Sequence, residues 1–282
     1  KTGRNGLRIG DIELQGFNEK FNNLTNKHKT LLQYYNYEND ISNDIEIWMD
    51  SINKIQEIQF IDSEYFLNEK LKQNKKILAE GAQGTLLDLD FGTYPFVTSS
   101  NTISAGACNG LGIAPNKIKN VIGIFKAYCT RVGNGPFPTE LKGQIGDEIA
   151  TKGNEFGSTT GRARRCGWID LPALKYAINI NGITELSMMK SDVLSGFEKI
   201  KVCVAYNYMG EEITHLPYNL NQNLLQPKYV TLDGWDQDIS GITSKEEIPT
   251  TFNKFILFLE NELQVPISII SIGPDRSQTI FR

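Results

Sequence analysis

The densest group of chemically useful side chains lies in one short polar segment of the chain. Residues 158 to 165 read Ser-Thr-Thr-Gly-Arg-Ala-Arg-Arg, so three hydroxyls and three guanidinium groups follow one another between flanking glycines. Guanidinium groups bind carboxylate and phosphate through paired hydrogen bonds, and glycine lets the backbone approach a ligand closely. The segment therefore indicates a clamp for an anion, and a solvated basic loop is the alternative that chemistry alone leaves open.

Two more candidate sites follow short apolar runs. In Glu80-Gly-Ala-Gln-Gly84 the amide of Gln83 can both donate and accept hydrogen bonds, although the same glycines could form a plain turn. In Lys190-Ser-Asp192 the carboxylate could accept two hydrogen bonds from guanine while the lysine stem covers the ring. A surface ion pair is the alternative for this second segment, because two residues are a weak signal.

Arginine is scarce in this chain and is placed unevenly. Its positions are Arg4, Arg8, Arg131, Arg162, Arg164, Arg165, Arg276 and Arg282. A codon bias toward lysine and asparagine accounts for the scarcity but not for the placement. Most of these arginines stand beside glycine in short polar segments, where a planar fork of donors meets phosphate or carboxylate in a way that lysine cannot.

The composition excludes several classes of protein. The net charge of −4 and the isoelectric point near 5.4 argue against nucleic-acid or anionic-membrane binding, which normally leaves a basic footprint. No apolar run approaches the length of a membrane span, so a cytoplasmic protein is expected. Four scattered cysteines and two histidines make disulfides or a histidine-ligated metal site poor interpretations, and we expect no metal site in this chain.

The elements that must position these side chains follow an α/β pattern. Apolar spacing predicts helices within residues 18–76, 171–181 and 250–263. Short apolar runs predict buried strands at 77–80, 121–128, 184–189 and 266–271, and residues 199–208 and 211–216 predict a hairpin that turns at Met209-Gly210. The expected fold is one large domain, 1–282, with a mainly parallel β-sheet flanked by helices and a small β-hairpin subregion.

Five motifs give the chain a recognisable signature. They are E-G-A-Q-G-T-L-L-D at 80–88, G-T-Y-P-F-V-T-S-S-N-T at 92–102, T-R-V-G-N-G-P-F-P-T-E at 130–140, G-N-E-F-G-S-T-T-G-R at 153–162 and G-P-D-R at 273–276. In sequence, order and spacing they closely resemble adenylosuccinate synthetase over the whole chain. That resemblance implies a fold related to P-loop-type GTP-binding folds and a GTP-dependent ligase that joins L-aspartate to inosine monophosphate (IMP) in purine nucleotide biosynthesis.

The resemblance also assigns residues to three ligands. It implies IMP contacts at Arg4, Gln83, Thr98 and Arg162, with Gln83 next to the reaction intermediate and Arg4 reaching the partner's site in a homodimer. It implies aspartate contacts at Val132, Ser158, Thr159, Thr160, Gly161, Arg162, Ala163 and Arg164. It implies GTP contacts at Arg164, Lys190, Ser191, Asp192, Ser271, Ile272 and Gly273. Lys1 and Arg8 match further basic positions, and Ala163 stands where the family often has arginine.

The chain departs from the family pattern at its beginning. It opens without methionine, and the phosphate loop that carries the family's catalytic aspartate and histidine is expected to precede Lys1, together with most ligands of Mg2+. Neither His28 nor His215 lies in a matching motif. We therefore expect an N-terminally truncated chain that is inactive by itself. The alternatives are another nucleotide-using α/β ligase or transferase, or a non-catalytic guanine-nucleotide-binding or dimerisation fragment.

Overall fold

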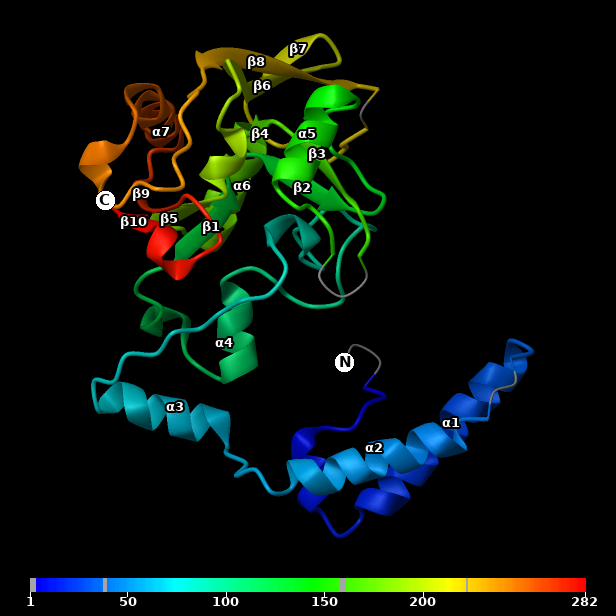
Figure 1. The fold of residues 1–282 in the computed structure, drawn as a ribbon. Helices are drawn as coiled ribbons and strands as arrows, with labels where there is room; N and C mark the ends of the chain where they lie inside the picture. Colours follow the sequence, from blue (N-terminus) through cyan, green and yellow to red (C-terminus); the bar gives the residue numbers. More distant parts are fainter. Residues whose placement is uncertain (1–3, 38–39, 158–160, 222) are drawn as a thin grey trace. The chain divides into compact units, whose positions relative to one another are not determined.

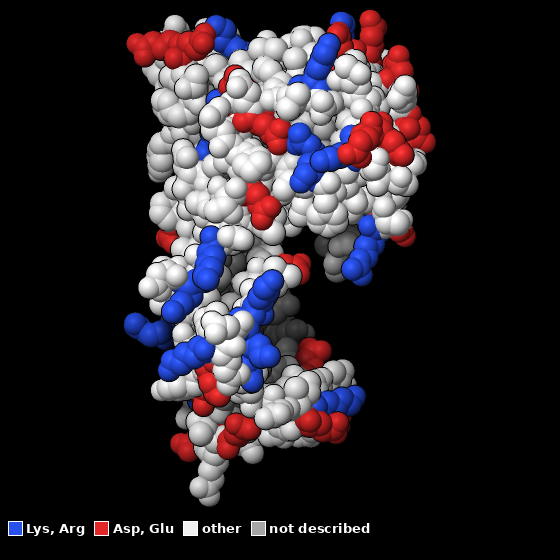
Figure 2. All heavy atoms as spheres, turned by 90° about the vertical axis from the view of Figure 1, so that its left-hand side faces the viewer, with Lys and Arg blue, Asp and Glu red and all other residues white. Residues whose placement is uncertain are grey.

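Two units make up the chain in the computed structural model, which describes residues 4–37, 40–157, 161–221 and 223–282 (Figure 1). The first unit covers Lys1–Glu69 and the second covers Lys70–Arg282. None of the helices in the described ranges combines the length and the apolar character needed to cross a bilayer. Figure 2 shows acidic and basic side chains interspersed over the upper part of the face it draws, so this face has no large area of a single charge there.

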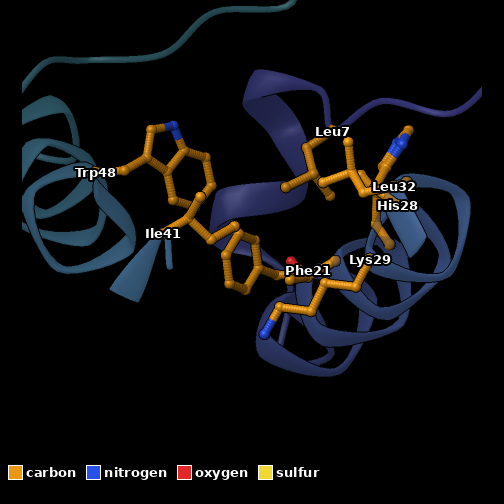
Figure 3. Close-up of a pocket in the computed structure, with 9 residues that line it drawn as sticks. Leu7, Phe21, His28, Lys29, Leu32, Ile41 and Trp48 are labelled. Carbon is orange, nitrogen blue, oxygen red and sulfur yellow. The ribbon is translucent and has the colours of Figure 1, made fainter. Parts of the chain in front are cut away.

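The first unit is helical, as predicted for residues 18–76. It contains η1 (Ile9–Glu13), α1 (Phe17–Tyr34), α2 (Ser42–Ile55) and the first part of α3 (Ser63–Lys72). Trp48 on α2 stacks on Phe21 of α1 with ring centroids 5.0 Å apart, which holds the two helices together. These rings border an apolar groove that also contains Leu7, His28 and Ile41 (Figure 3).

A four-stranded sheet forms the centre of the second unit. Its order is β1 (Ile122–Lys126), β5 (Glu185–Met189), β9 (Ile267–Ser271) and β10 (Thr279–Phe281). The first three strands run parallel and β10 is antiparallel to β9. Leu186, Met188 and Ile270 are completely buried, as expected for strands of a parallel sheet that is covered on both faces. The predictions for residues 121–128, 184–189 and 266–271 are confirmed.

Two helices of this unit begin and end where the sequence predicts. α6 (Leu171–Asn181) starts at Asp170, whose side chain accepts a hydrogen bond from the Ala173 amide, and ends at Gly182 in the left-handed conformation. α7 (Thr250–Leu263) buries a face of Phe252, Phe255, Ile256 and Leu259. Trp235 lies 4.4 Å from Phe252 between ring centroids, which ties the connection before α7 into the same core.

A second sheet contains the predicted hairpin. β6 (Lys199–Tyr208) pairs with β7 (Glu211–Ile213), and it also pairs with β4 (Ile169–Asp170) and β8 (Leu225–Asp233). A separate antiparallel ribbon joins β2 (Cys129–Val132) to β3 (Arg164–Gly167). The remaining elements are α4 (Ala105–Leu111), α5 (Gln144–Lys152), η2 (Thr85–Leu87), η3 (Pro115–Lys117), η4 (Ser191–Leu194), η5 (Lys245–Glu247) and η6 (Arg276–Gln278).

One predicted element is wrong. Residues 77–80 were expected to form a buried strand, but they have no regular structure and Leu78 is 89% exposed. No strand within the described ranges pairs with this segment. An apolar run of three residues becomes a strand only when a sheet edge is available to it, because strand stability comes mainly from cross-strand contacts.

Candidate functional site

The carboxyl ends of the parallel strands bring two groups of predicted site residues, 190–192 and 271–273, to one edge of the sheet. β1 and β5 are in register with Lys126 opposite Met189, so Lys126 lies next to the turn that begins at Lys190. β9 continues the same edge with Ser271 and Ile272. In parallel α/β sheets this edge is where ligands bind, because the loops that follow the strands converge there.

Glu155 lies completely buried at this edge and collects basic side chains from three elements. Its Oε1 is 2.7 Å from Lys126 Nζ and its Oε2 is 2.9 Å from Arg164 Nη1. Lys190 Nζ lies 3.3 Å from Oε1, and it also donates to the carbonyl of Gly153. The Tyr128 hydroxyl donates to Oε1 at 2.5 Å. A single carboxylate therefore holds the end of β1, the start of β3 and the turn after β5.

The charge state of Glu155 follows from these contacts. Burial alone would raise the pKa of its carboxyl, but the hydrogen bonds from Lys126, Tyr128 and Arg164 outweigh burial and lower the pKa to about 2. Burial also lowers the pKa of Lys126, although the carboxylate of Glu155 opposes that effect. Glu155 thus remains ionised at neutral pH and balances one of the three cations around it.

The segment 158–165, called the arginine loop from here on, leads into β3 of the β2–β3 ribbon. Val132 is opposite Arg164 in this ribbon, and the base of the loop is closed by a 2.8 Å hydrogen bond from the Gly157 amide to the Arg162 carbonyl. A Cβ atom placed on Gly133 would lie 3.5 Å from Nη1 of Arg162. The guanidinium group of Arg162 therefore lies close to Gly133, which follows Val132 in the sequence. Gly161 is left-handed, with φ of +62°, and Ala163 is exposed. Ser158, Thr159 and Thr160 lie outside the described residues.

The segment with Gln83 and Thr98 is ordered by a different buried acid, Asp88. Its carboxylate accepts backbone hydrogen bonds from residues 90, 91, 102 and 103, which lowers its pKa although burial acts in the opposite direction. Gln83 is exposed with a left-handed φ of 63°, and the Thr98 amide donates to the Leu87 carbonyl at 2.8 Å. Two hydrogen bonds from Arg131, on β2, tie this segment to the ribbon that carries Arg164.

Asp192 lines a pocket and has one buried side-chain oxygen without a partner among the described residues. Its Oδ1 is buried and accepts no hydrogen bond from the described part of the chain, and burial raises the pKa of this carboxyl above its usual value. The hydroxyl of Ser191 is likewise buried without a partner there. Buried polar atoms are nearly always paired, so this oxygen of Asp192 has room for one more hydrogen-bond donor, from a ligand or from an ordered water. The pocket is lined by Lys152, Asp192, Val193, Ser195, Gly196, Asp236, Asp238 and Ser240.

The turn after β9 borders the same region. The Ser271 hydroxyl donates to the Gly273 carbonyl at 2.9 Å, and Ile272 is completely buried with its amide donating to the Gln278 carbonyl at 3.0 Å. A side chain at Gly273 would overlap the amide of Gln278, which donates to the carbonyl of Ser240 in the pocket wall. This packing fixes the turn close to the pocket that contains Asp192.

Arg4 belongs to the first unit, Lys1–Glu69, and not to the unit that contains the other predicted contacts. It is exposed and adopts a left-handed φ of 55°. Arg8 is at the start of η1, where its amide donates to Asp11 at 2.7 Å, and Lys1 lies outside the described residues. No group of three His, Cys, Asp or Glu side chains gathers as a metal site in the part of the chain that is described.

Glu155, Lys126 and Tyr128 were not singled out in the sequence, although their neighbours Arg164 and Lys190 were. Glu155 was visible only as one letter of a glycine-rich motif, and Lys126 and Tyr128 were visible only as part of an apolar strand. Their contacts join residues 27 to 29 positions apart. The one available signal was the position of Lys126 near the carboxyl end of the strand predicted at 121–128, where α/β proteins place functional side chains.

Comparison with known proteins gives one consistent result. A family model described as adenylosuccinate synthetase matches residues 1–280. The chain is 56% identical to adenylosuccinate synthetase of Flavobacterium johnsoniae over 284 residues, and 55% identical to that of Bacteroides fragilis over 282 residues. A solved structure of fully ligated adenylosuccinate synthetase from Plasmodium falciparum is 39% identical, with a TM-score of 0.93.

These matches extend over all of this chain but over only part of the relatives. The chain covers 67% of the Flavobacterium protein, 66% of the Bacteroides protein and 67% of the Plasmodium chain. A cyanophage succinoaminodeoxyadenylate synthetase structure is 16% identical with a TM-score of 0.50, which shows a likeness of fold alone.

Proposed function

The chain belongs to the adenylosuccinate synthetase family of ligases, and from this premise we propose that it contributes to the GTP-dependent joining of L-aspartate to IMP, which gives adenylosuccinate, GDP and phosphate. The observation that carries the proposal is the orphaned carboxylate oxygen of Asp192 beside Lys190, at the ligand-binding edge of a parallel sheet. The cytoplasm is the proposed compartment.

The proposed reaction has two steps. The γ-phosphoryl group of GTP is transferred to O6 of IMP, which converts a poor leaving group into a good one. The amine of aspartate then forms a bond to C6, and the C6–O6 bond breaks with release of phosphate. Because charge on the transferring group must be balanced, such reactions depend on positioning and on nearby cations.

Asp192 and Lys190 are the proposed readers of guanine. The carboxylate would accept hydrogen bonds from the two donors on the guanine edge, which adenine does not present in that arrangement. Lys190 is anchored through its ammonium group by Glu155 and Gly153, so its aliphatic stem is held in place to cover the base. Ser191, Ser271, Ile272 and Gly273 would complete this site.

The arginine loop is the proposed site for aspartate. Arg162 and Arg164 would bind its carboxylates, with Arg164 shared with GTP, because a guanidinium offers two parallel donors to each carboxylate. The other contacts proposed for aspartate are Val132, Ser158, Thr159, Thr160, Gly161 and Ala163. The short distance from Arg162 to Gly133, the neighbour of Val132, supports a common binding surface.

The proposed IMP contacts are Gln83 and Thr98 in the second unit, together with Arg162. Gln83 would also contact the intermediate that carries phosphate on O6. Arg4 would act across a homodimer, in the site of the partner subunit. Mg2+ is the proposed metal cofactor, with most of its ligands expected in the phosphate loop of the family.

The direct test is product formation by the protein expressed from its whole gene. Incubation with IMP, aspartate and GTP is expected to give adenylosuccinate and GDP in equal amounts, measured by liquid chromatography and mass spectrometry, and ATP in place of GTP is expected to give little product. Equal product with ATP would remove the guanine assignment. Binding of GTP without any product would favour a non-catalytic guanine-nucleotide-binding protein.

A further inference from the structure

A single buried carboxylate connects two binding regions that lie on different loops. We propose that Glu155 is a positioning residue that holds Lys190 and Arg164 in place together, so that guanine-nucleotide binding and aspartate binding both depend on it. This inference rests on the proposed function and extends it to a residue that would touch neither ligand.

The geometry separates the roles of the two carboxylate oxygens. Oε2 contacts Arg164 at 2.9 Å, whereas Oε1 lies 3.3 Å from Lys190 and accepts a hydrogen bond from Tyr128 at 2.5 Å. Lys126 bridges both oxygens at 2.7 and 2.8 Å. One carboxylate thus sets the direction of two side chains that belong to different proposed sites.

Glu155 is itself rigidly placed. It is completely buried, its amide donates to the Ala150 carbonyl, and its carbonyl accepts from the Arg164 amide, both at 2.9 Å. Tyr128, which is 1% exposed, fixes the carboxylate from the other side. The side chains of Arg164 and Lys190 are 30% and 38% exposed and reach toward solvent. The fixed partner is therefore the glutamate, and the adjustable partners are the two cations that would meet ligand.

Removing the charge of Glu155 would have two opposite effects on binding. The site would become more positive, which favours an anionic ligand. Arg164, Lys190 and Lys126 would also lose their common counter-charge, and neighbouring cations that repel one another move apart. A misplaced Lys190 cannot be compensated by a more positive field, since the guanine base is neutral. The positioning role therefore predicts weaker binding of both ligands, whereas a role in charge balance alone predicts tighter binding of aspartate.

The test measures binding of GDP, aspartate and IMP separately to wild-type and Glu155→Gln proteins expressed from the whole gene. We expect about tenfold weaker binding of GDP and of aspartate in the variant, with IMP binding changed less than twofold. Glu140→Gln is the matched control, because Glu140 pairs with the next arginine, Arg165, at 3.0 Å and contacts neither Lys190 nor Arg164 in the described structure. The control is expected to bind GDP and aspartate like the wild type.

Two further variants keep the test decisive. Glu155→Asp retains the charge on a shorter side chain and is expected to recover part of the lost affinity for both ligands. If Glu155→Gln does not fold, the double variant Lys126→Met/Glu155→Gln removes one cation together with the acid. It is expected to lose affinity for both GDP and aspartate in the same way.

The outcomes separate this inference from the proposed function. Wild-type protein that binds neither GDP nor aspartate contradicts the proposed function itself. Wild-type protein that binds both, with a folded Glu155→Gln variant that binds both equally well or binds aspartate more tightly, overturns only the positioning role. An equal loss for GDP, aspartate and IMP would also overturn it, because a general structural defect does not select between ligands.

Discussion

Glu155 and Asp192 are two carboxylates on either side of Lys190, and their surroundings differ completely. Glu155 is fully buried and accepts hydrogen bonds from Lys126, Tyr128 and Arg164, which lower its pKa to about 2. Asp192 has a buried oxygen without a partner in the described chain, and burial raises its pKa. The partners of Glu155 are all supplied by the protein, whereas Asp192 keeps an unused acceptor that we propose is for a ligand.

The difference has consequences for stability. Taking one partner from a buried ion pair leaves an uncompensated charge, which costs about 3–5 kcal/mol. Asp192 is only partly buried, and burial disfavours the charged form of its carboxyl, so replacing it with an amide removes a charge that is a net cost to the fold. Changing the acid to its amide should therefore lower the stability of the fold at Glu155 and should not lower it at Asp192.

The largest expected effect is on the unfolding of the second unit. Glu155→Gln is expected to lower its free energy of unfolding by about 3–5 kcal/mol, because three cations lose their common partner. Asp192→Asn is expected to change it by less than about 1 kcal/mol or to raise it. Hydrogen exchange of the β1 and β5 amides measures this quantity for the second unit. Equal losses in the two variants would contradict the contrast between the two acids.

Lowering the pH should remove the contribution of Glu155 to the free energy of unfolding. Its folded pKa of about 2 lies below the ordinary value of 4.5, so the carboxylate stabilises the fold above pH 4.5 and loses this effect as pH falls toward 2. The shift corresponds to roughly 3 kcal/mol. The free-energy difference between wild type and Glu155→Gln should therefore shrink as pH falls from about 4.5 to 2. A difference that stays constant over this range would exclude an ionised Glu155.

The arginine loop extends the contrast to ligand binding. Arg162→Leu is expected to raise the KM for aspartate by about 30- to 150-fold, equivalent to roughly 2–3 kcal/mol for a lost charge-assisted pair. The KM for GTP should change far less, because this side chain is assigned to aspartate and IMP. Steady-state kinetics with each substrate varied in turn provides the measurement. Equal changes in both constants would give the loop another role.

The smallest effect on stability is expected at another buried acid, Asp170. Its Oδ1 accepts from the Tyr206 hydroxyl at 2.6 Å and from the Ala173 amide, both neutral donors, and burial raises its pKa to about 6. Since the folded state favours the protonated form, ionisation of Asp170 lowers stability as pH rises from about 4 to 6. Asp170→Asn keeps both acceptor contacts and should change stability at pH 7 by less than about 1 kcal/mol. Unfolding of wild type and variant from pH 4 to 7 tests this, and a large loss at pH 7 would contradict it.

The elements that the sequence predicted well are those determined by local patterns. Helices α6 and α7 have the predicted bounds because a capping Asp170, a terminating Gly182 and an apolar face are all readable within a few residues. Strand β8 was not predicted, and it contains Pro227, which weakens a strand pattern. Its place beside β6 depends on pairing with residues at least 17 positions away.

The candidate site was predictable only where motif and chemistry coincide. The arginine loop and the Lys190–Asp192 turn were singled out by their polar side chains, and the sheet edge that joins them was expected from α/β topology. Glu155 could not be distinguished from any other acid, because its role comes from burial and from partners on three separate elements.

Competitive binding of GDP and ADP tests most directly whether the unpaired oxygen of Asp192 accepts hydrogen bonds from guanine, as we propose. The account predicts that the protein expressed from its whole gene binds GDP far more tightly than ADP. Asp192→Asn should weaken GDP binding by about 30-fold, equivalent to roughly 2 kcal/mol, and leave ADP binding nearly unchanged, because an amide group opposes the donors of guanine. Equal affinities of the wild type for GDP and ADP, or an unchanged preference in the variant, would contradict the account.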